Sequence, residues 1–245
     1  MSSLLGLPPA RVAPDAAALA RLRELVTADE PSQEPHGLPP MDLDTLVATL
    51  LAVEDEAVAR HRRLGLDDER SAATLADVGR KVASYGDWAP LWWLVEILRA
   101  DVVATGRLQV QRVPGPDGAE LHIPEGGPLT PEAVDAALVD VAIVVGPVPL
   151  PCTSWLFDPA LEALPETSNI RRFVARFDIT PTEPSEAGDS DAARFVFRRP
   201  VAEVLDPSLV TPRTTLERVV AEHLRGGRHW SVPQGMLRVG PSSTS

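Results

Sequence analysis

Hydrophobic residues recur at helical spacing through most of the first hundred residues. Residues 15–28 place Asp15 in the N-cap position ahead of leucines on one stripe. Residues 42–63 repeat apolar positions at i, i+3, i+4 and i+7, and residues 71–84 and 88–100 continue in the same way. The last of these segments has a very apolar surface. The pattern predicts a helical N-terminal region.

A different pattern begins at residue 106, where apolar and polar positions alternate as they do in a half-buried strand. The predicted strands are 106–113, 119–124, 152–157, 173–179 and 194–197. Residues 181–192 are predicted to form an acidic loop, and the tail beyond Val239 is predicted to fray. The predicted helices of this part start near capping residues, which are Thr130, Asp158, Ser168 and either Thr211 or Thr214. Together these elements predict an α+β fold.

The composition of the chain argues against several classes of protein. The 245-residue chain has 23 basic and 35 acidic residues and a net charge of −12, which disfavours nucleic acid and anionic membranes as partners. Its single cysteine excludes an intrachain disulfide, and no Cys/His cluster has the spacing of a structural zinc site. No apolar run reaches the ~20 residues of a membrane span, and the N-terminus lacks the basic region of a secretory signal. We therefore expect a soluble, cytoplasmic protein.

A strand, a Gly-Gly loop and a helix start follow one another in LHIPEGGPLTPEA, residues 121–133. Loop amides and a helix N-terminus present N–H groups and a partial positive charge, which is an arrangement that holds a phosphate. Gly126 and Gly127 would let the backbone come close to such a ligand. The alternative is a simple strand-to-helix turn, and Pro128 and Pro131 remove two of the N–H donors.

His122 and Glu125 flank the end of this strand and form a candidate acid–base pair. Either side chain is able to accept the proton of an amine nucleophile. The alternative is a structural or exposed role for both, because the sequence shows no partner for either.

Two candidate nucleophiles, Cys152 and Ser154, lie on one face of the predicted strand 152–157. No G-x-S-x-G motif surrounds Ser154, and Cys152 precedes an apolar run, so a buried structural role is the favoured interpretation. The pair Ser168-Asn169 favours a helix cap, with polar contacts to an amide or pantetheine group as the alternative.

Two further clusters are three arginines and three tryptophans, namely Arg171, Arg172, Arg176, Trp88, Trp92 and Trp93. The arginines favour a solvated surface, with binding of a phosphorylated or carboxylate ligand as the alternative. The tryptophans favour a core or an interface. His223 and His229 do not have the spacing of metal ligands.

Four stretches in order carry a resemblance to a known family. They are GRLQVQRV, LHIPEGGPLTPEAVDAAL, CTSWLFDPALEALPETSNIRRFVARF and TTLERVVAEHLRGG. In them the chain resembles the bacterial acyltransferase-like proteins that join a helical N-acyltransferase N-terminal domain to a GNAT-like C-terminal domain. The resemblance covers roughly residues 88–238. It implies a shortened helical N-terminal region over 1–87, which matches in helical character only, and a GNAT-like domain over 88–240.

The resemblance implies an α+β (α/β) fold whose GNAT-like part is a mixed, splayed β-sheet flanked by helices. Acyl-CoA would bind between two central strands. The pyrophosphate would lie on the loop 125–131, with Gly126, Gly127, Leu129 and Thr130 as its binding residues.

The usual reaction of this superfamily transfers an acyl group from a thioester to an amine, with a general base and backbone donors that polarise the carbonyl. By position, the resemblance assigns His122 and Glu125 to catalysis. It assigns five residues to the substrate cleft, which are Cys152, Ser154, Trp155, Ser168 and Asn169. The implied donor is acyl-CoA or an acyl carrier protein, the implied acceptor is a small amine, and no metal is expected.

Two other functions remain open. A non-catalytic GNAT-like module would keep the cleft and hold a metabolite or a protein partner, and the loop EGGPLT indeed lacks the leading Gln or Arg of the ordinary GNAT pyrophosphate signature. A structural protein would instead oligomerise through the apolar surface of WAPLWWLVEIL. The oligomeric state itself does not follow from the sequence.

Overall fold

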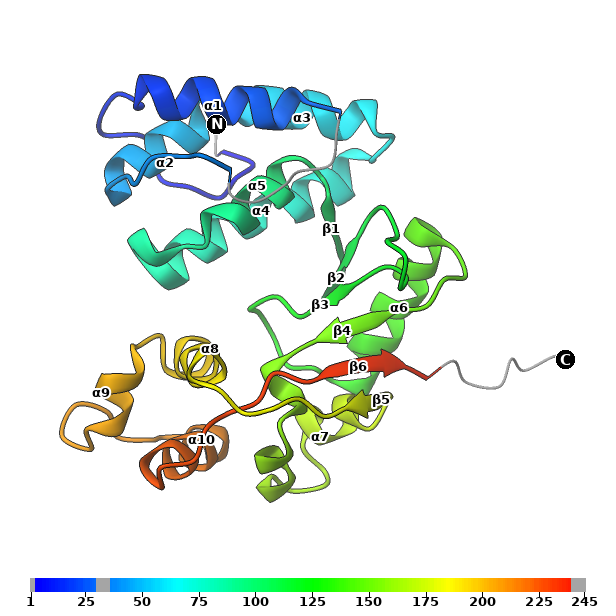
Figure 1. The fold of residues 1–245 in the computed structure, drawn as a ribbon. Coiled ribbons are helices and arrows are strands. Elements are labelled where there is room, and N and C mark those ends of the chain that lie inside the picture. The colour runs from blue at the N-terminus through cyan, green and yellow to red at the C-terminus, as the bar shows by residue number, and fades with distance from the viewer. Residues whose placement is uncertain (1–2, 30–35, 239–245) are drawn as a thin grey trace, which may run out of the picture. The chain divides into compact units, whose positions relative to one another are not determined.

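The structure is a computed structural model, and it describes residues 3–29 and 36–238. The predicted tail beyond Val239 therefore lies outside the described residues, as do residues 30–35. The chain divides into two compact units. The first holds residues 1–113, 123–126 and 143–145, and the second holds 114–122, 127–142 and 146–245. Figure 1 shows the order of the elements.

The first unit confirms the helical N-terminal region. Its elements are α1 (Ala16–Thr27), α2 (Leu43–Leu51), α3 (Glu54–Arg63), α4 (Asp68–Tyr85), the 3₁₀ turn η1 (Gly86–Trp88), α5 (Leu91–Leu98), β1 (Val102–Thr105) and β2 (Leu108–Gln111). Asp15 caps α1 as predicted, because its side chain accepts the Ala18 N–H at 2.8 Å. The single helix predicted over 42–63 is wrong. Val53, with φ −114° and ψ 8°, interrupts it between α2 and α3.

The strand predicted over 106–113 is in fact the second half of a hairpin. β1 pairs antiparallel with β2, and Val102 lies opposite Gln111. Gly106, at φ +68°, provides the turn between them. All four residues of β1 are buried, so β1 lacks the polar–apolar alternation by which a strand is recognised.

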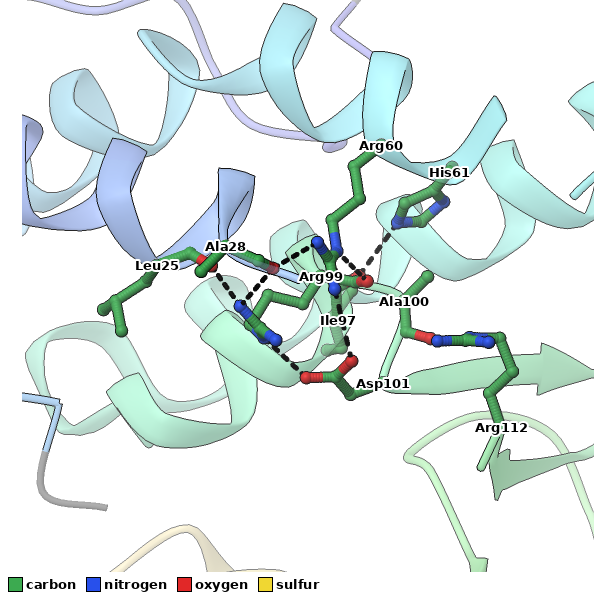
Figure 2. Close-up of polar contacts among 9 residues, drawn as sticks. All are labelled: Leu25, Ala28, Arg60, His61, Ile97, Arg99, Ala100, Asp101 and Arg112. Carbon is green, nitrogen blue, oxygen red and sulfur yellow. Dashed lines mark hydrogen bonds and ion pairs between the residues drawn. The ribbon is translucent and has the colours of Figure 1, made fainter. Parts of the chain in front are cut away.

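Leucines and valines from α1 to α5 form the core of the first unit. Two buried arginines donate hydrogen bonds to backbone carbonyls at the C-terminal ends of α1 and α5, as Figure 2 shows. Arg60 donates from Nε to the Arg99 carbonyl at 2.7 Å, and Arg99 donates to the carbonyls of Leu25 and, at 3.3 Å, Ala28. The carboxylate of Asp101 accepts from Arg99 Nε at 2.5 Å. These bonds satisfy C-terminal carbonyls of α1 and α5 that have no partner within their own helices.

His61 belongs to the same buried region. Its Nε2 contacts the Ile97 carbonyl at 3.1 Å, and its Nδ1 contacts Ser71 Oγ at 3.0 Å. Because the imidazole is fully buried, desolvation lowers its pKa to about 4, although the backbone hydrogen bond favours the charged form. His61 is therefore a neutral structural residue at physiological pH.

The second unit contains β3 (Leu121–His122), most of α6 (Pro131–Val145), β4 (Pro151–Thr153), the 3₁₀ turns η2 (Trp155–Phe157) and η3 (Pro159–Ala163), α7 (Asn169–Val174), β5 (Phe177–Thr180), α8 (Glu186–Phe197), α9 (Val201–Leu205), α10 (Thr215–Arg225) and β6 (Gln234–Leu237). β6 lies between β4 and β5 and is antiparallel to both. Figure 1 shows α8, α9 and α10 packed together. The combination of helices with small sheets confirms the α+β fold class.

Several boundaries of the second unit differ from the prediction. The strand predicted over 194–197 is wrong, because those residues end α8, and α8 also occupies the second half of the predicted loop 181–192. The strand predicted over 173–179 begins only at Phe177, since α7 occupies the residues before it. The run 152–157 is a strand only to Thr153 and then turns into η2. Short runs of aromatic and β-branched residues fit a strand and a buried helix turn equally well.

The sheet of the second unit packs on an aromatic cluster. Phe177 lies with its ring centroid 4.9 Å from that of Phe157 and 5.1 Å from that of Phe173. Gly235 of β6 packs over these rings, because a Cβ there would lie 2.9 Å from Phe157 Cε2. This close approach explains why the central strand carries a glycine. Among the described residues, no helix is long and apolar enough to span a membrane.

Candidate functional site

Glu125, a predicted catalytic residue, is held within the first unit. Its carboxylate accepts hydrogen bonds from Lys81 Nζ and from the Tyr85 hydroxyl. The side chains of Lys81 and Glu125 are only 8% and 14% exposed. The Lys81 ammonium also lies 5.7 Å from the ring centroid of Trp93, at cation–π distance.

This environment sets the charge of Glu125. Burial by itself raises the pKa of the carboxyl, but the charge of Lys81 and the hydrogen bonds from Lys81 and Tyr85 outweigh burial and lower the pKa. The carboxylate is therefore an anion whose two oxygens are already occupied. The adjoining backbone is fixed as well, because Arg107 Nη1 donates to the Pro124 carbonyl at 2.9 Å. In this arrangement Glu125 fixes the loop in place and is a poor proton acceptor.

The glycines that follow are open to solvent. Gly126 has φ +150°, and a Cβ built on either Gly126 or Gly127 would meet nothing within 4 Å. Thr130 caps α6 as predicted, because its Oγ1 accepts the Ala133 N–H at 3.3 Å. Its neighbour Leu129 is buried, with 7% exposure. The loop has room for a ligand. The N-terminus of α6 has few backbone N–H groups available to that ligand, since Pro131 has no N–H and the Ala133 N–H is bonded to Thr130.

His122, the other predicted catalytic residue, is half-buried at the end of β3. It belongs to the second unit, whereas Glu125 belongs to the first. An imidazole at a strand end next to the Gly-Gly loop is able to take a proton from a neutral amine.

The predicted cleft residues on β4 and η2 have structural contacts. Cys152 is 1% exposed, and burial, together with the charge of Glu120, raises the pKa of its thiol to about 12. The neutral thiol is not a nucleophile. Ser154 caps η2 by accepting the Leu156 N–H at 3.1 Å. Trp155 stacks on Phe195 with 6.3 Å between ring centroids.

The predicted cleft residues near α7 form a helix start. Ser168 Oγ accepts the Arg171 N–H at 3.1 Å, and Asn169 is the first helical residue. This is the cap geometry that the sequence favoured. The hydroxyl of Ser168 is thereby engaged with the backbone.

A cavity of about 520 Å³ lies within the second unit, close to these residues. Its walls come from η2, η3, α7, β5 and the segment that leads from α10 into β6. None of the five predicted cleft residues lines it, but the residues directly after Trp155 do. Most of the lining surface is apolar. Its polar side chains are those of Asp158, Glu162, Arg171, Thr182, His223, His229, Ser231 and Arg238. A largely apolar cavity with a few polar groups is typical of a small-molecule site.

Sequence reasoning missed a His–Asp pair at this cavity. His229 Nδ1 lies 2.7 Å from Asp189 Oδ2, and the buried Asp189 also accepts the Trp230 N–H at 2.6 Å. The hydrogen bond that His229 makes to the Asp189 carboxylate, together with the negative charge of that carboxylate, raises the pKa of His229. The partners are far apart in sequence, and Asp189 fell in a segment interpreted as loop, so no sequence signal joined them.

The arginine and tryptophan clusters have mixed environments. Arg176 pairs with Asp135 at 2.5 Å, whereas Arg171 lines the cavity. Trp93 is buried, but Trp88 and Trp92 are 55% and 46% exposed. No group of three or more His, Cys, Asp or Glu side chains suited to a metal ion lies within residues 3–29 and 36–238.

Two protein-family models match this chain and show which family it belongs to. The family model described as "GNAT-like C-terminal domain" matches residues 68–237, and the one described as "N-acyltransferase N-terminal domain" matches residues 4–100. The chain belongs to this acyltransferase family. No curated protein sequence matches it.

Solved acyltransferase structures have the same fold over nearly the whole chain. One, in complex with decanoyl-CoA and teicoplanin, is 30% identical with a TM-score of 0.81, and the match covers 97% of this chain and 86% of that one. A second, in complex with decanoyl-CoA, is 29% identical with a TM-score of 0.74, covering 91% and 76%. A third, in complex with CoA and 10C-teicoplanin, is 28% identical with a TM-score of 0.72, covering 96% and 92%. The family and the GNAT-like fold inferred from the four sequence stretches are confirmed, although the sheet β4-β6-β5 is antiparallel and not mixed.

Proposed function

We propose that this acyltransferase-family protein transfers an acyl group from acyl-CoA to an amine. The observation that carries the proposal is the match, over almost the entire chain, to acyltransferases crystallised with decanoyl-CoA or CoA. Acyl-CoA thioesters are made and used inside cells, so we also propose the cytoplasm as its location.

The overall test is an acyl-transfer assay. Purified protein is incubated with decanoyl-CoA and either teicoplanin or a small primary amine, and the acylated acceptor is detected by mass spectrometry. We expect acceptor-dependent release of CoA together with one acyl-amide product. Donor binding without any product from either class of acceptor would contradict the proposal.

The donor phosphates would lie on Gly126, Gly127, Leu129 and Thr130. The openness of both glycines supports this placement, since a ligand could contact the backbone there. We expect Gly127→Asp to weaken decanoyl-CoA binding by about tenfold or more, because a carboxylate would repel the phosphates. Gly115→Asp, at an exposed turn elsewhere, is the matched control and should leave the dissociation constant unchanged. Equal binding by both variants would remove the loop from the donor site.

For the base we propose His122, since Glu125 is an anion already occupied by Lys81 and Tyr85. His122→Ala should lower turnover by about 10²–10⁴ while donor binding is kept. Glu125→Ala should act through the position of the loop, and so should raise the KM for the donor. If His122→Ala leaves turnover unchanged and Glu125→Ala abolishes it without affecting KM, the two roles are reversed.

A second candidate function is a GNAT-like binding module without catalysis. The observation that favours it is the small number of free amides at the start of α6, where Ala133 N–H is already bonded and Pro131 has none. Saturable ligand binding with no acylated product, in the assay described above, would support this function in place of the first.

A further inference from the structure

The cavity of the second unit has a charge pattern that points to its ligand. We propose that it is the acceptor site, and that it takes an amine that also carries an apolar group and a carboxylate, with the carboxylate on Arg171. This inference rests on the proposed acyl transfer, whose acceptor is an amine. It adds the class of that amine and a residue that selects it.

The apolar side chains that line the cavity suit an apolar group. Phe157 and Phe177, with ring centroids 4.9 Å apart, both line it, as do Leu161 and Ile179. The volume of about 520 Å³ lies within the range of small-molecule sites, roughly 300–1,000 Å³. Burial of an aliphatic or aromatic group against these side chains would supply affinity without specificity for charge.

Most charged groups around the cavity are already paired. Arg238 donates to Asp178 at 2.6 Å and to two backbone carbonyls. Asp158 is 4% exposed and accepts from Ser231 N–H at 2.7 Å, from Ser231 Oγ at 2.6 Å and from Ala160 N–H at 2.7 Å. His229 is paired with Asp189. These side chains line or border the cavity, but their hydrogen bonds and ion pairs within the protein leave them few contacts to offer a charged ligand.

Arg171 is different. Within the described parts of the chain, its guanidinium has no hydrogen bond and no ion pair, although it lines an apolar cavity. A guanidinium binds a carboxylate through two parallel hydrogen bonds, which makes the contact both strong and specific. Arg172, the next residue of α7, is exposed and is not among the lining residues.

The remaining charges agree with an amino-carboxylate. Glu162 lines the cavity and is exposed, and within residues 3–29 and 36–238 its carboxylate has no ion-pair partner, so it attracts the amine end of such a ligand. The ring of His223 also lines the cavity.

The reaction balances with such an acceptor. The amine nitrogen forms a bond to the thioester carbonyl, and the carbon–sulfur bond breaks. The proton that the amine loses ends on the sulfur of CoA, which leaves as the thiol. No oxidant, reductant or metal is required.

The test compares L-phenylalanine with two probes that each differ from it at one group. L-phenylalaninamide has an amide in place of the carboxylate, and 3-phenylpropionate lacks the amine. With decanoyl-CoA as donor, we expect Arg171→Met to lower kcat/KM for L-phenylalanine by about 10–100-fold and to leave L-phenylalaninamide within about twofold. Arg172→Met is the matched control and should change neither. An equal loss for both acceptors, or no loss for either, would overturn the role of Arg171.

A binding arm keeps the inference testable without turnover. 3-Phenylpropionate should bind the wild-type protein in the absence of donor, and should fail to bind Arg171→Met. If it instead displaces decanoyl-CoA and Arg171→Met weakens donor binding, the cavity belongs to the donor and the inference is wrong. Absence of any donor binding by the wild-type protein would count against the proposed function, while the 3-phenylpropionate result would still decide the site.

Discussion

Lys81 is the only lysine in the chain, and its ammonium is buried against Glu125 and Tyr85. The sequence drew attention to Glu125 through its place beside a Gly-Gly loop, and suggested a base. It did not show that a lysine more than forty positions earlier neutralises this carboxylate. Local motifs locate a site, whereas the charge state of each residue depends on partners that only the fold brings together.

The ion pair makes a prediction for stability. Glu125→Gln leaves the Lys81 charge buried without its partner, and we expect the free energy of unfolding at pH 7 to fall by about 3 kcal/mol. The pKa of Glu125 is lowered in the folded state, so its contribution is present above the usual value of 4.5 and is lost as the pH falls through the lowered pKa. The difference between wild type and variant should therefore shrink below pH 4.5. Urea unfolding at several pH values measures it.

Glu166→Gln, at an exposed position without a described partner, is the control for the preceding experiment and should unfold as the wild type does. A Glu125→Gln variant as stable as this control would show that the buried ion pair adds nothing.

The buried His61 should make the free energy of unfolding depend on pH in a second range. Its folded pKa of about 4 lies below the ordinary 6.5, so the unfolded chain binds the proton first as the solution is acidified. Stability is therefore full above pH 6.5 and decreases by about 3 kcal/mol as the pH falls to 4. His61→Gln should reduce this slope between pH 6.5 and 4. Parallel stability curves for the two proteins would contradict the buried, neutral imidazole.

At the scale of elements, the caps were the most predictable feature. Asp15, Thr130, Ser168 and Thr214 each accept a backbone N–H at the start of the helix that their position predicted. A cap depends on three or four consecutive residues, so the sequence contains all of it. The error at 194–197 has the opposite origin, since α8 is fixed by packing against residues distant in the chain.

The packing of α8 makes its own prediction. Gly188 lies in the first turn of α8, and a Cβ there would stand 2.0 Å from the Trp230 carbonyl oxygen. Alanine normally stabilises a helix relative to glycine by about 1 kcal/mol. Gly188→Ala should nevertheless lower the melting temperature, because the backbone of residue 230 has to move. Gly115→Ala, where the nearest atom lies 3.9 Å away, should not. A Gly188→Ala protein of raised stability would disprove this contact.

At the scale of the whole molecule, the family followed from ordered short motifs, and the domain models extend it to residues 4–237. The division at residues 87 and 88 stays a prediction. The cavity proposed as the acceptor site was not predictable, because its lining comes from segments between positions 156 and 238 that no single motif includes. The substrate class therefore had to be inferred from the structure.

The proposed acyl transfer depends on binding of acyl-CoA as the donor. The measurement that tests it most directly is calorimetric titration of the folded protein with decanoyl-CoA, with acetyl-CoA in parallel and Gly127→Asp as the variant. We expect micromolar binding of one donor per chain and a clear loss of affinity in Gly127→Asp. Absence of binding to both thioesters, from a protein with a cooperative unfolding transition, would contradict it.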